Sequence, residues 1–339
     1  MPAPASECRQ RARVLLLCAA LAVLAGCGEQ PGYQRHGGDT MGTYYQVTAR
    51  CPVDVGPAVE ATLRQVNAEM STYLPDSELS RFNSAPPGEW FPVSAALAEV
   101  LAAADTLSRE SGGAFDVTVG PLVNLWGFGP DGATAPPADA VVADTLAGIG
   151  HRHLDVRREP PGVRKARPLY VDLSAIAKGH GVDRVVARLD EAGCDALLVD
   201  VGGEVRGRGL SPSGRPWRIG IEVPDPAQMG SVQRVITLED AAVATSGDYR
   251  NFLESDGHRY SHTIDPRTGR PVDHTLASVS VVHDSAMWAD GYATLLNVLG
   301  PEDGPAFAER AGLAALFIER RENGFRERYT PAFERLLAD

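Results

Sequence analysis

The stretch LASVSVVHDSAMWADGYATLLNVLGP, residues 276–301, contains a strand and a helix separated by only a few polar residues. Leu276 to His283 is a valine-rich apolar run, which predicts a strand. Ala286 to Leu299 predicts a helix, because Gly300-Pro301 then supplies a combination that commonly ends helices. This part of the chain therefore combines both kinds of element.

The segments on either side give the same mixture. Residues 217–223 and 232–238 predict two strands that pair with each other, and residues 196–201 predict a buried strand. The range 56–71 predicts a helix, since its apolar residues recur at spacings of three and four. Further expected elements are a strand at 44–49 and helices at 94–111, capped by Ser94, and at 182–192. Helices mixed with antiparallel strands favour an α+β fold with mixed or antiparallel sheets over a doubly wound sheet.

The N-terminal segment has the composition of an export signal. Three arginines precede an apolar run over residues 14–24, which is short for a membrane span. Small residues then lead to Leu24-Ala25-Gly26-Cys27, a pattern typical of bacterial lipoprotein processing sites. We expect residues 1–26 to be a lipoprotein signal peptide and Cys27 to carry the lipid. The alternative is a plain signal peptide cut at an Ala-x-Ala-like site.

Lipidation predicts a protein of the bacterial cell envelope that is attached to a membrane by its lipid and faces the periplasm. Residues 27–38 are Gly-rich and polar, and we expect them to form a tether between the lipid and the domain. The domain is then expected over residues 39–333. Its length permits one large core or two subdomains.

Charge and cysteine content exclude some classes of function. The net charge of −12 becomes −14 once residues 1–26 are removed, and we find no basic stripe, so nucleic acid is not expected as a partner. Cys51 and Cys194 remain in the mature chain, where they form either one disulfide or two buried thiols. The sequence has no Cys/His cluster that indicates zinc.

Asp290 and Thr294 are the first candidate site residues. They are four residues apart in the expected helix, so both lie on one face, one turn apart. A carboxylate and a hydroxyl stacked in this way offer two oxygen ligands to a hard cation. The alternative is an ordinary solvated helix face.

Three further segments predict contacts with an anion or a planar ring. VDLSAIAKGHGVD, residues 171–183, predicts a strand, a glycine turn and a helix, where Lys178 can add a positive charge near a phosphate. ATSGDYRNF, residues 244–252, places hydroxyls at an expected helix start. Residues 112–129 are aromatic and apolar between glycines and can form a wall for a ring. The alternatives are ordinary turns, a simple N-cap and a core strand.

His262 lies in RYSHTIDPRTGRP, residues 259–271, two residues before a segment whose Asp265-Pro266 and Thr268-Gly269 predict a turn. A single histidine is commonly structural, so this stretch alone does not assign it a function. Its imidazole is nevertheless the side-chain type best suited to move a proton near neutral pH.

Taken together and in this order, eight motifs resemble the ApbE family, the FAD:protein FMN transferases. The resemblance covers roughly Thr40 to Tyr329. The motifs are MGTYYQV, MSTYLPDSELSRFN, FDVTVGPL, DLSAIAKGHGVD, VGGE, ATSGDYRNF, YSHTIDPRTGRPV and ADGYATLL.

The resemblance implies two subdomains that form an FAD cleft, and an enzyme that uses a divalent cation, usually Mg²⁺. Such enzymes transfer the FMN half of FAD to a threonine hydroxyl of a target protein and release AMP. Their targets are subunits of membrane redox complexes of the Na⁺-pumping quinone reductase (Nqr) and Rnf types. The family favours the inner membrane, whereas Gly28 after the lipidated cysteine favours the outer membrane in enterobacteria.

The resemblance also implies roles for individual residues. Metal ligands would be Asp290, Thr294 and the backbone carbonyl of Ala175, and His262 would be the base. FAD would contact Met41, Tyr73, Ala114, Phe115, Asp116, Asp172, Lys178 and Ile264. The chain departs from the common family pattern at Ser174-Ala175, at His180 and at Glu204. Two rival functions remain: an FAD pyrophosphatase that gives FMN and AMP, and a flavin-binding lipoprotein without turnover.

Overall fold

The computed structural model describes residues 32–129, 135–228, 230–248, 252–255 and 258–337. The expected signal peptide and the lipidation residue Cys27 lie outside these residues. Tyr33–Asp339 form one compact unit, so the two expected subdomains are not separate bodies. None of the helices in the described residues is long and apolar enough to cross a membrane.

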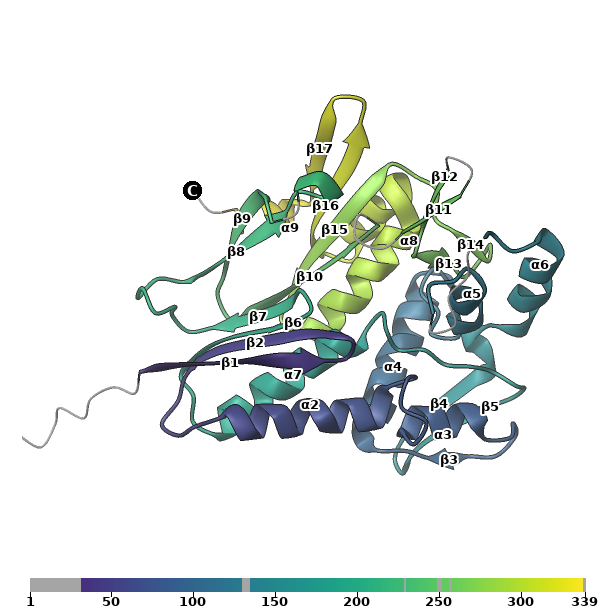
Figure 1. The fold of residues 1–339 in the computed structure, drawn as a ribbon, viewed down its shortest axis with the longest axis horizontal. Helices are drawn as coiled ribbons and strands as arrows, with labels where there is room; N and C mark the ends of the chain where they lie inside the picture. The colour runs from purple at the N-terminus through teal and green to yellow at the C-terminus, as the bar shows by residue number, and fades with distance from the viewer. Residues whose placement is uncertain (1–31, 130–134, 229, 249–251, 256–257, 338–339) are drawn as a thin grey trace, which may run out of the picture. The chain divides into compact units, whose positions relative to one another are not determined.

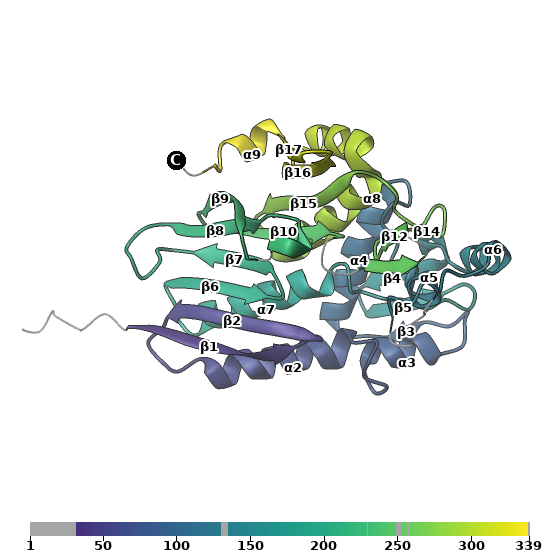
Figure 2. The same cartoon turned by 45° about the horizontal axis from the view of Figure 1, so that its top comes forward.

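An eight-stranded sheet, antiparallel at every pairing, forms the centre of this unit (Figures 1 and 2). Its strands in spatial order are β1 (Tyr33–Thr40), β2 (Thr43–Arg50), β6 (Ala196–Val201), β7 (Glu204–Arg208), β10 (Ala241–Gly247), β15 (Leu276–His283), β16 (Ala314–Arg321) and β17 (Gly324–Tyr329). This sheet, together with the helices packed on it, confirms the expected α+β class.

Helices cover one face of the sheet, and a hairpin packs on the other. The covering helices are α2 (Gly56–Met70), α4 (Ala95–Glu110), α7 (Ala177–Glu191) and α8 (Ala286–Arg310). In Figure 1, α2 and α7 lie below β1 and β2, and α8 runs beside β10 and β15. The strands β8 (Trp217–Glu222) and β9 (Val232–Leu238) pair with each other as expected. Their apolar side chains join residues of β7, β15 and β16 in a separate small core.

Shorter elements complete the end of the unit away from β1 (Figure 1). A three-stranded sheet has the order β3-β5-β4, and two pairs of very short strands, β11-β12 and β13-β14, lie near α5 and α6 (Figure 2). These elements are α3 (Glu78–Ser84), β3 (Phe91–Pro92), α5 (Gly120–Leu125), α6 (Asp139–Gly148), η1 (His151–His153), β4 (Leu154–Arg158), β5 (Pro161–Lys165), β11 (Phe252–Ser255), β12 (His258–Ser261), β13 (Ile264–Asp265) and β14 (Arg270–Pro271). Elsewhere, η2 (Pro226–Gln228) lies between β8 and β9, and α9 (Pro331–Glu334) packs on β16.

Most expected elements are present within one or two residues of their predicted ends. Ser94 caps α4 as predicted, because its hydroxyl accepts a hydrogen bond of 3.1 Å from the amide of Leu97. The stop expected at Gly300-Pro301 is a break inside a longer helix. Gly300 has φ 78°, which interrupts the hydrogen-bond ladder, and helical structure resumes to Arg310.

Three expectations are wrong in detail. Residues 33–38, expected in the tether, belong to β1, whose polar composition suits an exposed edge strand. Residues 244–247, expected at a helix start, lie in β10, because pairing with β15 fixes an extended backbone. Residues 171–173 form no strand, and α7 begins at Ala177, so Gly179 lies inside a helix rather than in a turn.

Cys51 and Cys194 form a disulfide, which resolves the alternative that the sequence left open. The bond joins the end of β2 to the loop before β6, across 143 residues of chain. Both sulfur-bearing residues are buried beside α2 and α7. The disulfide therefore links the ends of the neighbouring strands β2 and β6, next to the end of α7.

Candidate active site

A cavity of about 800 Å³ lies against the ends of α7 and α8, and it reaches over the open face of β2, β6 and β7 toward β8. Almost all the residues predicted for the site line this one cavity: Met41, Ala114, Phe115, Asp116, Asp172, Ala175, Lys178, His262, Ile264, Asp290 and Thr294. Tyr73 is the exception. It follows α2, is 67% exposed and does not line the cavity.

The junction of α7 and α8 determines where Asp290 lies. A Cβ atom on Gly179 would be 2.2 Å from the carbonyl oxygen of Ala286, so only glycine permits this helix crossing. The same close approach lets the Gly179 amide donate a 3.0 Å hydrogen bond to Oδ2 of Asp290. The glycine that we interpreted as part of a phosphate-binding turn therefore brings two helices together.

Asp183 of α7 fixes the start of α8. One of its carboxylate oxygens accepts from the hydroxyl of Ser285 at 2.6 Å and from the amide of Met287 at 3.0 Å. The other accepts from the amide of Ala286 at 3.0 Å and from Arg206 at 2.5 Å. A carboxylate at a helix N-terminus satisfies amides that lack partners within the helix. The sequence analysis gave Asp183 no role.

Asp290 and Thr294 face the cavity from the same side of α8, as their spacing predicted. Asp290 is only 3% exposed. The hydroxyl of Thr294 lies 3.0 Å from the hydroxyl of Ser246 on β10. The strand β10, which occupies residues expected at a helix start, therefore places the Ser246 hydroxyl beside α8, the helix with the two predicted metal ligands.

A buried charge cluster lies at the bottom of the cavity. Nζ of Lys178 is 2.7 Å from Oε1 of Glu204 and 3.9 Å from Oδ1 of Asp290. Burial lowers the pKa of Lys178, but attraction to the two carboxylates outweighs burial and holds this pKa above its usual range. Lys178 therefore remains a cation at the cavity wall.

The two carboxylates of this cluster share a single cation. Burial raises the pKa of Glu204 to about 7, with a further contribution from Asp290, and Lys178 only partly opposes the rise. Burial likewise raises the pKa of Asp290, against the attraction of Lys178 and the hydrogen bond from Gly179. With both acids ionised the cluster has one negative charge in excess.

These residues fit a divalent cation. Oε2 of Glu204 is buried and has no hydrogen-bond partner among the described residues, and Glu204 lines the same cavity as Asp290. A carboxylate, a hydroxyl and a backbone carbonyl are hard oxygen donors of the kind that Mg²⁺ prefers. No group of three or more His, Cys, Asp or Glu side chains that could hold a metal occurs in the described ranges. The ligand set expected from the family resemblance is not a group of that kind, because Asp290 is its only acidic side chain.

His262 follows β12, is half-buried, and lines the cavity. Its ring meets that of Phe128 edge to face, with centroids 6.3 Å apart. The turn predicted after it is present, because the Gly269 amide donates to the carbonyl of Asp265 at 2.8 Å. The indole of Trp126 donates to the carbonyl of Gly269 at 2.9 Å and ties this turn to α5.

A sequence model of the ApbE family matches residues 41–317. The chain belongs to the ApbE family. Two members from other bacteria, each named FAD:protein FMN transferase, are similar over most of both chains. The Vibrio cholerae serotype O1 protein is 45% identical over 333 residues, which cover 96% of this chain and 98% of that one. The Haemophilus influenzae protein is 42% identical over 325 residues, covering 92% and 94%.

Solved ApbE structures have the same fold. The Pseudomonas stutzeri flavinyl transferase ApbE, in its apo form, superposes with a TM-score of 0.83 at 42% identity, and the match covers 91% of this chain and 98% of that one. The flavin transferase ApbE from Vibrio cholerae gives 0.83 at 44% identity, covering 90% and 99%.

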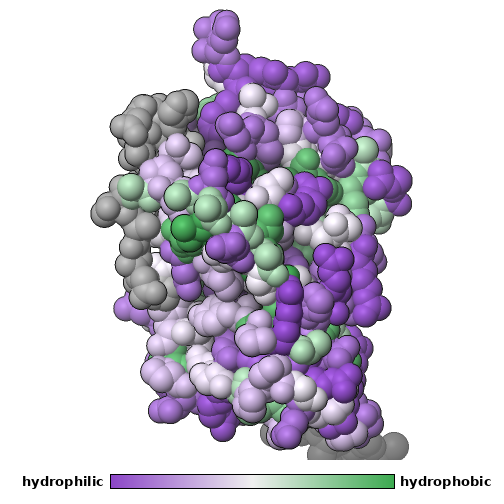
Figure 3. Space-filling view, turned by 90° about the vertical axis from the view of Figure 1, so that its right-hand side faces the viewer, coloured by the Kyte–Doolittle hydropathy of each residue, from purple (hydrophilic) through white to green (hydrophobic). Residues whose placement is uncertain are grey.

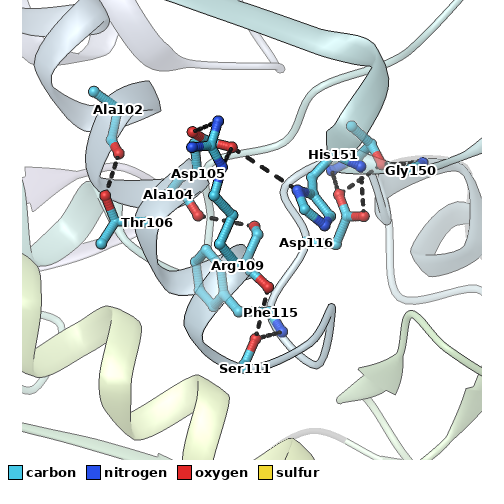
Figure 4. Close-up of polar contacts among 12 residues, drawn as sticks. Ala102, Ala104, Asp105, Thr106, Arg109, Ser111, Phe115, Asp116, Gly150 and His151 are labelled. Atoms are coloured by element: carbon cyan, nitrogen blue, oxygen red, sulfur yellow. Dashed lines mark hydrogen bonds and ion pairs between the residues drawn. The ribbon is translucent and has the colours of Figure 1, made fainter.

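Two acids of this ApbE-family cavity are occupied by internal hydrogen bonds. Oδ1 of Asp116 accepts from the amide and the hydroxyl of Thr118, at 2.8 and 2.6 Å, and Oδ2 accepts from the amide of His151 at 2.8 Å (Figure 4). Oδ1 of Asp172 accepts from the amide of Ser174 at 2.7 Å. Both carboxylates therefore shape the wall of the cavity, which sequence patterns alone did not indicate.

Glu204 and His180, both noted as departures from the common pattern, are buried. The signal for Glu204 was an acid directly after the Gly202-Gly203 turn, yet nothing in the sequence placed it against Lys178. His180 is 3% exposed on α7 and does not line the cavity, so it has no access to a flavin or adenine ring there.

Proposed function

We propose that this chain is a transferase that moves the FMN part of FAD to a threonine hydroxyl of a target protein and releases AMP. The names of the similar proteins support flavin transfer to a protein. The observation that carries the proposal is the cavity itself, where Lys178, Asp290 and Thr294 on α7 and α8 face the same space as His262.

The residues suggest a specific division of work. His262 removes the proton of the acceptor hydroxyl, whose oxygen then attacks the phosphorus on the FMN side of the diphosphate. The bond from that phosphorus to the bridging oxygen breaks, and AMP leaves with the electron pair. Lys178 supplies a fixed positive charge near the diphosphate, in a site where burial strengthens electrostatic interactions.

Mg²⁺ is part of the proposal. Asp290, Thr294 and the backbone carbonyl of Ala175 would hold the ion, which would offset the negative charge that develops on the diphosphate oxygens. Support comes from the excess negative charge of the buried cluster and from its unpartnered carboxylate oxygen.

Mass spectrometry distinguishes the proposal from its two rivals. The mature protein is incubated with FAD, Mg²⁺ and a purified acceptor subunit of an Rnf-type or Nqr-type complex. Transfer adds the mass of one FMN to the acceptor and releases AMP in equal amount. Release of free FMN and AMP with an unmodified acceptor would instead identify a pyrophosphatase. Intact FAD bound to the protein would identify a flavin carrier. The Asp290→Ala variant is the control, and we expect it to fold and to transfer nothing.

We further propose export and lipid attachment at Cys27, with the domain in the periplasm and its acceptors in membrane redox complexes. The Cys51–Cys194 disulfide supports this location, because stable disulfides are characteristic of oxidising compartments. The Cys27→Ser variant should carry no lipid and should leave the membrane fraction. A wild-type protein without lipid mass that stays in the membrane would contradict the proposal.

A further inference from the structure

A positively charged segment lies within an acidic protein. Residues 150–167, here called the basic hairpin, comprise η1, β4, β5 and the residues beside them. They contain six basic side chains and two acidic ones, and thus contribute +4 to a total of −12. The rest of the chain therefore carries −16. The basic residues are Arg152, Arg157, Arg158, Arg164, Lys165 and Arg167.

Two arginines of the basic hairpin are held flat on its outer face. The guanidinium carbons of Arg157 and Arg164 lie 4.4 and 5.0 Å from the ring centroid of Trp90. Arg157 also crosses Gly162, where an added Cβ would meet its Nε at 2.9 Å. Stacking on an aromatic face orients a guanidinium, so Trp90 holds the positive charges of both arginines in fixed positions on the hairpin.

Most of this positive charge is not neutralised within the protein. Arg164 pairs with Asp155 at 2.8 Å, but within the described ranges Arg152, Arg157 and Arg158 have no ion pair. The side chains of Arg152 and Arg158 are exposed. Lys165 differs, since it is buried and its ammonium donates to three backbone carbonyls, which fixes the hairpin from inside.

The basic hairpin is directly connected to the wall of the cavity. The His151 amide donates to Asp116, and the Gly150 amide donates to the hydroxyl of Thr118 at 2.7 Å (Figure 4). In Figures 1 and 2, β4 and β5 lie at the same end of the unit as β13 and β14, and His262 shortly precedes β13 in the chain. Figure 3 views this end and shows mainly hydrophilic side chains, with small hydrophobic areas between them.

We infer that the basic hairpin is the docking surface for an acidic face of the acceptor protein, an inference that rests on the proposed function. A negatively charged partner is repelled by the remaining chain and attracted to this one segment. Docking there would bring the partner to the end of the molecule where His262 lies. Oriented attraction of this kind mainly raises the rate of association, and salt weakens it.

The test compares a charge reversal on the hairpin with a matched reversal elsewhere. The variant is Arg152→Glu combined with Arg158→Glu. The control is Arg64→Glu combined with Arg188→Glu, which changes the charge equally at exposed positions of α2 and α7. Two substrates are used: a purified Rnf-type acceptor subunit, and a synthetic peptide containing only its acceptor threonine and neighbours.

For the whole acceptor, we expect kcat/KM of the hairpin variant to fall about 10- to 100-fold at low salt, through KM. Its salt dependence should also become flatter than that of the wild type. FAD affinity and transfer to the peptide should remain at the wild-type level. Arg152→Lys with Arg158→Lys should restore activity toward the whole acceptor.

Three results would overturn the inference. Equal KM values for the hairpin variant and the control would remove the docking surface while leaving the transferase function intact. Unchanged KM together with lost binding to phosphatidylglycerol vesicles would assign the hairpin to lipid headgroups. A wild-type protein that transfers FMN to neither substrate would refute the proposed function, and the docking surface with it.

Discussion

The two sides of the cavity are held in place by very different amounts of structure. On one side, α7 and α8 cross within the core, joined by the Gly179 contact and by three hydrogen bonds from the start of α8 to Asp183. On the other side, His262 precedes a pair of two-residue strands, and a few hydrogen bonds fix the turn between them.

The difference corresponds to the two substrates of the proposed reaction. A cation and a diphosphate require oxygen atoms at closely defined positions, which crossing helices provide. An acceptor protein must bind at the cavity and dissociate again. The short β13–β14 pair beside His262 permits this, because few of its contacts need to change. A change that separates α7 from α8 should therefore affect folding and FAD binding together, whereas a change at the β13–β14 turn beside His262 should affect mainly the transfer step.

The largest effect is expected for Gly179→Ala. The new methyl group would overlap the backbone of Ala286, so α7 and α8 must separate. The free energy of unfolding should fall by about 3 kcal/mol, and Mg²⁺-dependent FAD binding should be lost. Urea unfolding and FAD titration measure both quantities. Gly148→Ala in α6 is the control, because nothing lies within 4 Å of the added methyl group. Full FAD binding by the Gly179 variant would show that the helix crossing does not define the site.

His262→Ala tests the side of the cavity next to the β13–β14 turn. Transfer should fall about 10²- to 10⁴-fold, the usual contribution of a positioned base, while FAD affinity and melting temperature stay nearly unchanged. The wild-type rate should rise with pH as the imidazole loses its proton, and the variant should lack that rise. If FAD affinity and melting temperature fell in parallel with the rate, His262 would have a structural role instead.

His180 on α7 should make an acid-sensitive contribution to stability, opposite in sign to the contributions of Glu204 and Asp290, whose pKa values are raised. Burial lowers the pKa of His180 to about 4, with help from Arg184 and slight opposition from Asp183. Between pH 6.5 and 4 the unfolded chain binds a proton at His180 more readily than the folded chain does. The contribution of His180 to the free energy of unfolding is therefore fully present above pH 6.5 and falls as the pH drops. The loss amounts to about 3 kcal/mol. Unfolding curves at several pH values should show a shallower acid slope for His180→Gln, and equal slopes would contradict the prediction.

The smallest effect is expected for Trp126→Phe, which removes the hydrogen bond to Gly269. The unfolding free energy should fall by about 1–2 kcal/mol, because the buried carbonyl loses its donor. The transfer rate should decrease between about two- and tenfold, since only the placement of the His262 turn changes. Fixed-time transfer assays at saturating FAD measure the transfer rate. A loss as large as that of His262→Ala would mean that the turn is as tightly defined as the helical side.

Sequence patterns predicted the elements whose own residues determine them. The apolar spacing in α2 and the serine cap of α4 gave helices with nearly correct ends. The same local geometry placed Asp290 and Thr294 on one face, because a helix fixes residues four apart without help from the rest of the chain. The order of the eight motifs then indicated most of the cavity.

Features that depend on contacts between distant segments were missed or misjudged. Thr245 and Ser246 resemble a helix cap locally, but pairing with β15 determines their conformation. Glu204 and Lys178 meet only after β7 has packed beside α7. The basic hairpin was missed for another reason: a count over the whole chain hides a local excess. Tyr73 was expected at the FAD site, yet its exposed position is not on the cavity wall.

With the proposed lipid on Cys27, the early start of β1 would limit how far the enzyme can reach. Because ordered pairing begins at Tyr33, only residues 28–32 remain between a lipid on Cys27 and the folded unit. Five extended residues span at most about 18 Å. A tether of this length would confine the enzyme to a thin layer above the bilayer. Acceptors whose threonine lies within that layer would be modified, and identical threonines held farther from the membrane would be ignored.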